Sequence, residues 1–223
     1  MTKHDAGGVV VNDLAVADRT AFRRLVLLGT PLTLSLWEIF HPQPVGVGEA
    51  VTQGGWFMWF HIIQVPLFGL IALAVYLLTQ GLQSRAASVS RWAAGIFAVF
   101  FSAYDAAAGI ATGYALRSAQ GLSAGAQEAV HEAVIDMPGL SLIFGLSIVG
   151  TSAWVVALVA AAMALRRAGA SRGPFVLLIL AGVFLMGGHP FPAGTLAFGS
   201  FFLAAAWLEF GQCVMRAPEV AKP

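Results

Sequence analysis

Long runs of apolar residues, separated by short polar segments, dominate the chain. A helix needs about 20 apolar residues to cross the hydrocarbon core of a bilayer. The runs are continuously apolar, whereas strands of a membrane barrel alternate apolar and polar residues. Within the third run, Gly109 and Gly113 are four residues apart, a spacing that favours close helix packing. The pattern predicts an all-α, polytopic membrane helix bundle with six transmembrane helices: Phe22–Phe40, Trp56–Gln80, Trp92–Leu116, Met137–Leu165, Pro174–His189 and Gly194–Met215.

The polar segment between the third and fourth runs has a helical pattern of its own. Over Ser123–Asp136, apolar residues recur every three or four positions, and Glu128, His131 and Glu132 fall on the opposite side. Such a segment is typical of a helix that lies along a membrane surface. We therefore expect an extracytoplasmic amphipathic helix between the third and fourth spans.

Positive charges are distributed unevenly about the six spans. Of the 12 Lys and Arg residues, only Arg117 falls on the side that carries the amphipathic helix. By the positive-inside rule, both termini are then cytoplasmic. The sequence thus predicts a cytoplasmic tail over residues 1–21, a transmembrane domain over 22–215 and a second cytoplasmic tail over 216–223. The richness in Ala and Arg is typical of a bacterial protein, so we expect a multi-pass protein of the bacterial inner membrane.

Composition excludes several other classes. The chain is 58% hydrophobic and only 10% charged, while soluble domains are about 25% charged. A net charge of +1 gives no basic surplus for nucleic acid, so the expected partners are membrane lipids and a hydrophobic small-molecule substrate. The single Cys213 excludes a disulfide scaffold and a thiolate metal site. Lys3 and Lys222, the only lysines, lie in the tails, which excludes a Schiff base within the membrane.

Four of the five histidines map to the outer half of the predicted bundle. His41 and His189 each end an outward-running span, and each is followed by proline, which disfavours further helix. A single His-Pro dipeptide commonly marks only the end of a helix, but two of them at the same membrane depth point to function. His61 lies about 8 Å inside the outer end of its span, and His131 belongs to the amphipathic segment. Imidazole is a common ligand of metal ions and of haem iron.

Carboxylates accompany these histidines. Glu38 precedes His41 by three residues, so the two side chains share one helix face. The same spacing supplies ligand pairs in di-iron helix bundles. An ionisable residue within a span is costly and commonly functional. We therefore predict a metal site formed by His41, His61, His189 and Glu38, with three possible additional ligands: His131, Glu128 and Gln64.

Asp105 lies near the middle of the third span, roughly 15 Å below the outer surface. No Lys or Arg lies deep within a span to neutralise it, so its side chain must face the interior of the bundle. This depth favours a proton relay, a catalytic acid or a partner of a ligand over a ligand shared with His41 and His189. Glu209, near the inner end of the last span, is expected to form a structural ion pair.

Three functions fit these residues. In the first, the site binds zinc or iron, with copper also possible, and Glu38 and Asp105 assist catalysis on a lipid or other membrane-soluble substrate. In the second, two histidines bind b-type haem in an electron-transfer or quinone-linked protein. In the third, the polar residues line the path of a cation- or proton-coupled transporter. The first is the interpretation that we adopt.

Overall fold

The computed structural model of the chain describes residues 20–135 and 141–211. The predicted tails, apart from residues 20–21, lie outside these ranges, as do Asp136, Met137 and the end of the last predicted span. Every regular element within them is helical and none is a strand, which confirms the all-α prediction. In chain order the elements are η1 (Leu25–Gly29), α2 (Thr30–Trp37), η2 (Glu38–Phe40), α3 (Val47–Leu78), α4 (Arg85–Asp105), η3 (Ala106–Ala111), α5 (Thr112–Ser118), α6 (Ala124–Ile135), α7 (Ser141–Arg167), α8 (Arg172–Leu185) and α9 (Ala193–Gly211).

Among the described residues, four helices are long and apolar enough to cross a membrane: Val47–Leu78, Arg85–Ser118, Leu142–Arg167 and Ala193–Gly211. The second of these runs without a break through α4, the π-helical η3 and α5. α8 has 14 residues, about 21 Å of helix, against a hydrocarbon core of about 30 Å. The structure is therefore that of a membrane-type bundle, while crossing by residues 20–40 and by α8 stays a prediction.

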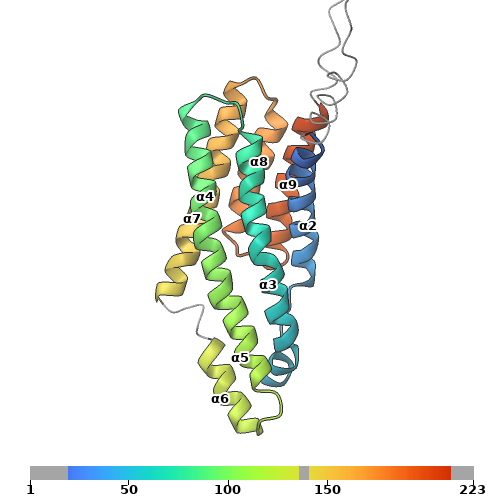
Figure 1. Ribbon diagram of the computed structural model, residues 1–223, viewed down its shortest axis with the longest axis vertical. Helices are drawn as coiled ribbons and strands as arrows, with labels where there is room; N and C mark the ends of the chain where they lie inside the picture. The colour runs from blue at the N-terminus through green and yellow to red at the C-terminus, as the bar shows by residue number, and fades with distance from the viewer. Residues whose placement is uncertain (1–19, 136–140, 212–223) are drawn as a thin grey trace, which may run out of the picture.

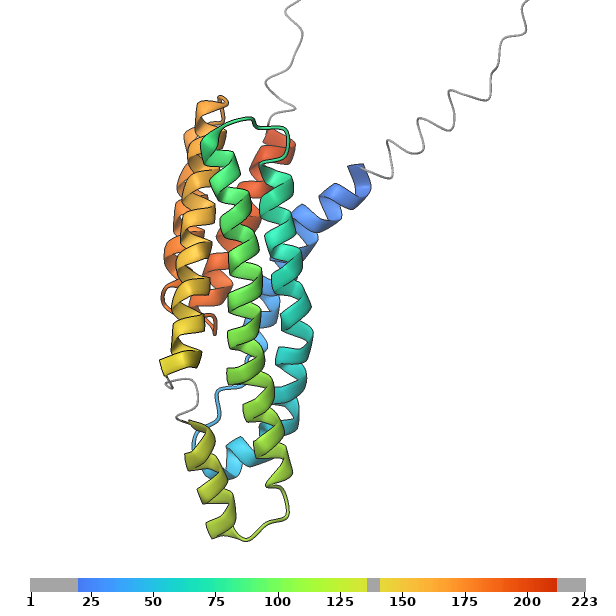
Figure 2. The same cartoon turned by 60° about the vertical axis from the view of Figure 1, so that its left-hand side comes forward.

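The helices of the bundle differ in length. α3 and the α4–η3–α5 helix continue well past the turn that joins α8 to α9 (Figure 1). They contain 32 and 34 residues, or about 48 and 51 Å of helix. Figure 2 shows the same two helices extending at one end of the molecule, with α6 folded back beside them. We call the part formed by α5, α6 and the first turns of α3 the extension.

The amphipathic segment forms a helix where the sequence predicts one, and this helix packs against others. Val130 and Val134 of α6 pack against α3 and α5, where Ala50, Val51 and Leu116 are buried with them. This packing is possible because α3 begins at Val47, earlier than the predicted start at Trp56. The apolar residues Val130 and Val134 of α6 therefore cover protein, and the location of this helix at a membrane surface stays a prediction.

Small residues allow α3 to approach η3 and α5 closely. A side chain at Gly113 would overlap the backbone of Met58, and one at Gly54 would overlap the backbone of Leu116 and Arg117. Gly113 is one of the two glycines whose spacing predicts close helix packing, and it allows that packing here. On the other side of the bundle, Trp154 of α7 is fully buried and donates a hydrogen bond to the carbonyl of Ala181 in α8, at 3.1 Å.

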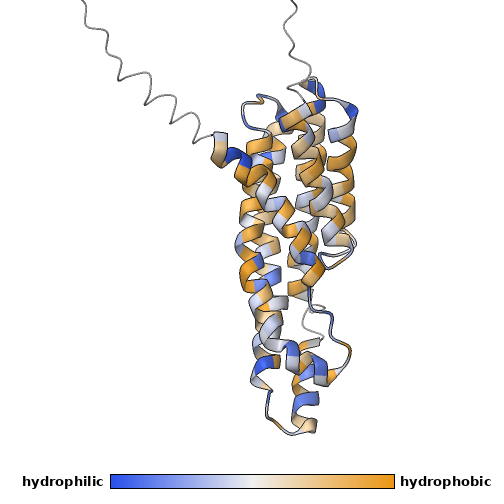
Figure 3. Cartoon of the chain, turned by 90° about the vertical axis from the view of Figure 1, so that its right-hand side faces the viewer, coloured by the Kyte–Doolittle hydropathy of each residue, from blue (hydrophilic) through white to orange (hydrophobic). Residues whose placement is uncertain are grey.

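All the described arginines except Arg117, which lies in α5, gather at the end of the bundle opposite the extension. The connections from α3 to α4 and from α7 to α8 lie there, together with the start of the first helix and the end of α9 (Figure 1). Figure 3 shows hydrophilic residues at this end and in the extension, and mostly hydrophobic ones between. Arg23 hydrogen-bonds Glu209, and Arg24 Nε lies 3.8 Å from the same carboxylate. Glu209 thus forms the predicted structural ion pair.

Candidate metal centre

His41 lies immediately after the 3-10 turn Glu38–Phe40, where the following proline ends the helix. Its backbone is extended, with φ −60° and ψ 123°. The ring Nδ1 lies 2.9 Å from the carbonyl of Pro42, so Nδ1–H donates there and leaves the lone pair on Nε2. Phe57 and Phe60 contact the ring edge-on and hold it in place.

His61 projects from the middle of α3 and is 2% exposed. Its Nδ1 lies 2.7 Å from the carbonyl of Phe57, one turn earlier, so this histidine also presents Nε2. A side chain at Gly109 of η3 would overlap the His61 ring. The first glycine of the predicted pair therefore makes room for the imidazole, in addition to bringing two helices together.

His189 lies in the turn between α8 and α9 and is buried. Gly188 precedes it with φ +100°, a left-handed conformation that favours glycine. A side chain at Gly194, in the first turn of α9, would overlap the carbonyl of His189 and crowd Glu38. The two glycines thus let the turn fold tightly beneath the end of the first helix.

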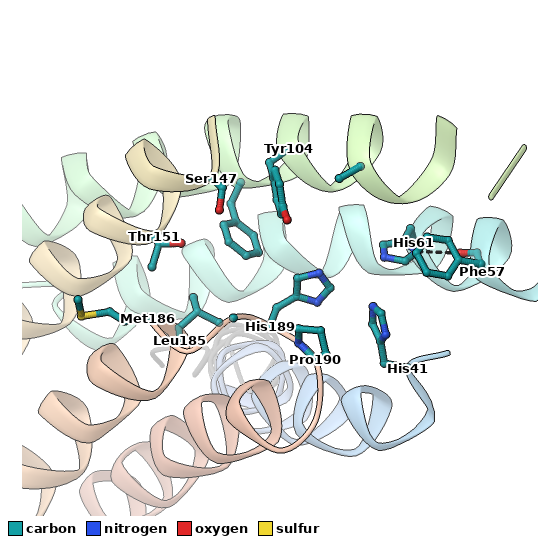
Figure 4. A pocket seen from close by; sticks show the side chains of 13 residues that line it. His41, Phe57, His61, Tyr104, Ser147, Thr151, Leu185, Met186, His189 and Pro190 are labelled. Atoms are coloured by element: carbon teal, nitrogen blue, oxygen red, sulfur yellow. Dashed lines mark hydrogen bonds between the residues drawn. The ribbon is translucent and has the colours of Figure 1, made fainter. Parts of the chain in front are cut away.

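The three histidines converge from widely separated parts of the sequence. One ring nitrogen of each lies within 4.8 Å of the others. The ring centroids are 5.0 Å apart for His41 and His189, 5.2 Å for His41 and His61, and 5.9 Å for His61 and His189. Figure 4 shows the three rings turned toward one another across a cavity. This group could hold a metal ion.

Two fully buried carboxylates adjoin the histidines. Glu38 Oε2 lies 3.5 Å from His189 Nδ1, while Asp105 Oδ1 lies 3.6 Å from His189 Nε2 and 3.9 Å from His61 Nε2. Glu38 also accepts a hydrogen bond from the amide of Gln64, which is fully buried. Asp105 therefore meets the histidines directly, and the depth argument that separated it from them is wrong.

Several buried polar atoms of this group have no hydrogen-bond partner in the described part of the chain. They are His41 Nε2 and both oxygens of Asp105. Buried polar atoms are normally paired, because an unpaired one loses its hydration without compensation. A cation bound among them would supply the missing partner for the nitrogen and oxygen lone pairs.

The electrostatics of His41 favour metal binding. Burial, and after it the proximity of His189 and His61, lowers the pKa of the His41 imidazole to about 3. The ring is therefore neutral near pH 7 and keeps a lone pair for a metal ion. Each of the other two rings likewise has its Nδ1 directed at an oxygen, namely the Phe57 carbonyl for His61 and Glu38 for His189. Metal-binding histidines are typically oriented in this way.

A cavity of about 250 Å³ adjoins the histidines. Its far wall carries three hydroxyl side chains, from Tyr104 of α4 and from Ser147 and Thr151 of α7 (Figure 4). These three residues were not predicted as site residues, because a hydroxyl side chain within an apolar run is too common to indicate a functional site. The cavity gives a small molecule room to reach the ring nitrogens.

Other candidate residues lie apart from this group. His131 lines a separate cavity below α6, and Glu128 is exposed on that helix. Gln64 contacts Glu38 rather than a histidine. The structure thus brings together His41, His61, His189, Glu38, Asp105 and Gln64, and keeps His131 and Glu128 away from them.

The fold and site define an all-helical, membrane-type protein with a buried three-histidine cluster. Comparison of the chain with protein-family models, with curated proteins and with solved structures gives no match.

Proposed function

We propose that the chain is a metal-dependent membrane enzyme whose ion is bound by His41, His61 and His189. The observation that carries this proposal is the convergence of three histidines within 4.8 Å, beside buried polar atoms that have no partner among the described residues. Ligand atoms arranged tetrahedrally about one ion at about 2.0 Å lie roughly 3.3 Å apart. The histidine cluster needs only a small contraction to reach that spacing.

The carboxylates take different roles in this proposal. Asp105 Oδ1 faces the Nε2 atoms of His61 and His189 at 3.9 and 3.6 Å, so it would be a further ligand, with one more position left for water or substrate. Glu38 faces Nδ1 of His189 at 3.5 Å and orients that ring. The sequence predicted Glu38 as a metal ligand and Asp105 as a partner of a ligand, so this assignment exchanges their roles. The second oxygen of Asp105 remains to accept a proton from water.

Imidazole together with carboxylate suits zinc or iron best, with copper also compatible. A bare ion is favoured over b-type haem, because cofactor pockets commonly occupy about 300–1,000 Å³, whereas the cavity at the histidines measures about 250 Å³. Such an ion polarises a carbonyl or lowers the pKa of water. The substrate reaches it through the cavity that Tyr104, Ser147 and Thr151 line.

The membrane arrangement is part of the proposal. Residues 20–40 and α8 join the four long helices as membrane segments, giving six spans. The end rich in arginine faces the cytoplasm, and the extension faces outward from the inner membrane. The site then lies near the outer boundary of the hydrocarbon core, where a membrane-soluble substrate can reach it.

Elemental analysis of the full chain, purified without chelators, tests the metal site. We expect about one zinc, iron or copper ion per chain, a loss of metal in His41→Ala and His189→Ala, and unchanged content in the matched variant His131→Ala. A Soret absorption band would show that the protein binds haem, and it would overturn the proposal in favour of the haem function. Metal-free protein that also fails to bind added cobalt(II) would overturn the metal site and leave the transport path.

A further inference from the structure

A second cavity of about 240 Å³ lies inside the extension, between α3, α5 and α6. Its wall is mostly apolar, with Ala50 from α3, Leu116 from α5 and Val134 from α6, all buried. His131 and Thr112 contribute the two polar side chains of the wall. Apolar cavities bind apolar molecules; an engineered example of about 150 Å³ holds benzene.

The second cavity adjoins the one at the histidines. Phe57 of α3 and Ala108 of η3 line both cavities. These two residues therefore form a wall that the two cavities share. Phe57 is partly exposed and contacts the rings of both histidines, so it stands at the boundary between the two cavities.

The two cavities differ in chemistry in a way that suits one elongated molecule. The first combines the histidines with the hydroxyls of Tyr104, Ser147 and Thr151, while the second is mostly apolar. None of the described residues that line either cavity is a lysine or arginine. A phosphate or carboxylate head would find no lysine or arginine in the wall, and two acids, Glu38 and Asp105, already lie beside the proposed ion to balance its charge. An uncharged carbonyl or hydroxyl head could hydrogen-bond to the hydroxyls.

Resting on the proposed function, we propose that the substrate is an uncharged amphiphile whose polar head lies at the histidines and whose aliphatic tail fills the second cavity. The volume of about 240 Å³ corresponds to about ten carbon atoms, by scaling from the cavity that holds benzene, so a chain of eight fits. The extension then has a specific task. It shelters the tail from water while the head is held at the ion.

Aliphatic hydroxamic acids, which are uncharged in solution at neutral pH and release a proton when they bind a metal ion, provide the probe. The full chain in lipid nanodiscs is loaded with cobalt(II), and its visible spectrum is titrated with acetohydroxamic and octanohydroxamic acid. We expect the longer chain to bind at least about tenfold more tightly, because each buried methylene adds affinity. Val134→Phe, which fills the second cavity, should abolish this difference and leave the affinity for acetohydroxamic acid unchanged. Ala133→Phe, at the exposed neighbouring position, is the matched control.

A second measurement needs no metal. In a Cys213→Ala background, Val134→Cys places a thiol in the wall of the second cavity. We expect 1-octanol to slow its reaction with N-ethylmaleimide at least fivefold, and octanoate and ethanol to have little effect.

The two measurements separate the two proposals. Cobalt binding without a chain-length effect, or equal protection by octanoate and octanol, overturns the tail cavity and leaves the metal site standing. If cobalt does not bind, the metal site fails, and the thiol experiment alone decides whether the cavity takes an uncharged aliphatic chain.

Discussion

The imidazole of His61 occupies the space into which a side chain at Gly109 would project. A single methyl group there must displace either the ring or the backbone of η3. Because the ring presents its Nε2 to the other histidines and to Asp105, a shift of the ring acts directly on the metal site.

Gly109→Ala should therefore weaken metal binding about 10- to 100-fold, and should destabilise the protein by about 1–3 kcal/mol through overpacking. Isothermal titration with zinc and a chemical-denaturation curve measure the two effects. Gly95→Ala in α4, where a side chain would meet nothing within 4 Å, is the control. It should be neutral or slightly stabilising, because alanine favours helix over glycine. Equal zinc affinity in the two variants would contradict the role of Gly109.

Asp105→Asn and Glu38→Gln should differ in their effects. If Asp105 is a ligand and Glu38 orients His189, the first change should remove most of the metal, while the second lowers affinity only about 10- to 100-fold. Metal content and zinc affinity, measured on the same preparations, distinguish the two. Glu209→Gln, which breaks an ion pair with Arg23 at the far end of the bundle, should leave both unchanged. The reverse ranking would return the ligand role to Glu38.

The stability of the metal-free protein should depend on pH through His41. Its pKa is lowered to about 3 in the folded state, chiefly by burial, from an ordinary value of 6.5. Between these values the unfolded chain binds more protons, so the stabilising effect is complete above about pH 6.5 and is lost as the pH falls toward 3. The contribution of one such group changes by up to about 1.4 kcal/mol per pH unit.

His41→Gln should flatten that dependence. Denaturation curves of metal-free protein from pH 4 to pH 8 measure it, and Gln43→Ala, an exposed position in the same segment, serves as the control. A slope that is the same for wild type and His41→Gln would show that the folded and unfolded states bind the same number of protons at His41.

The proposed orientation can be tested by labelling intact cells with a membrane-impermeant maleimide. In a Cys213→Ala background, Ser123→Cys lies before α6 and Gln83→Cys lies between α3 and α4; both positions are exposed. We expect the first cysteine to be labelled in intact cells, and the second to be labelled only after the membrane has been permeabilised. The opposite result would show that the protein has the opposite orientation in the membrane.

The sequence was sufficient for the helical class and for the group His41, His61 and His189, because apolar run length and the depth of a histidine follow directly from helix geometry. It failed for Asp105 for an identifiable reason. The prediction let all spans end at one plane, but α8 ends early and its turn carries His189 down to the level of His61 and Asp105. Relative helix heights depend on packing, which a run of apolar residues does not encode.

The start of α3 and the cavity wall were missed for related reasons. Val47–Gly55 is too polar to be recognised as part of a span, and it is helical because α5 and α6 cover it. Tyr104, Ser147 and Thr151 gain meaning only from their position opposite the histidines. Gly109 could be recognised from its spacing to Gly113, although its contact with an imidazole could not.

The residues around the candidate ion come from the first, second and third helical runs and from the turn before the last helix. A ribosome that has delivered residues 1–170 to the membrane has supplied Glu38, His41, His61 and Asp105, but not the histidine that both acids face. The proposed metal site would therefore stay open until α8 and the turn that carries His189 have been made.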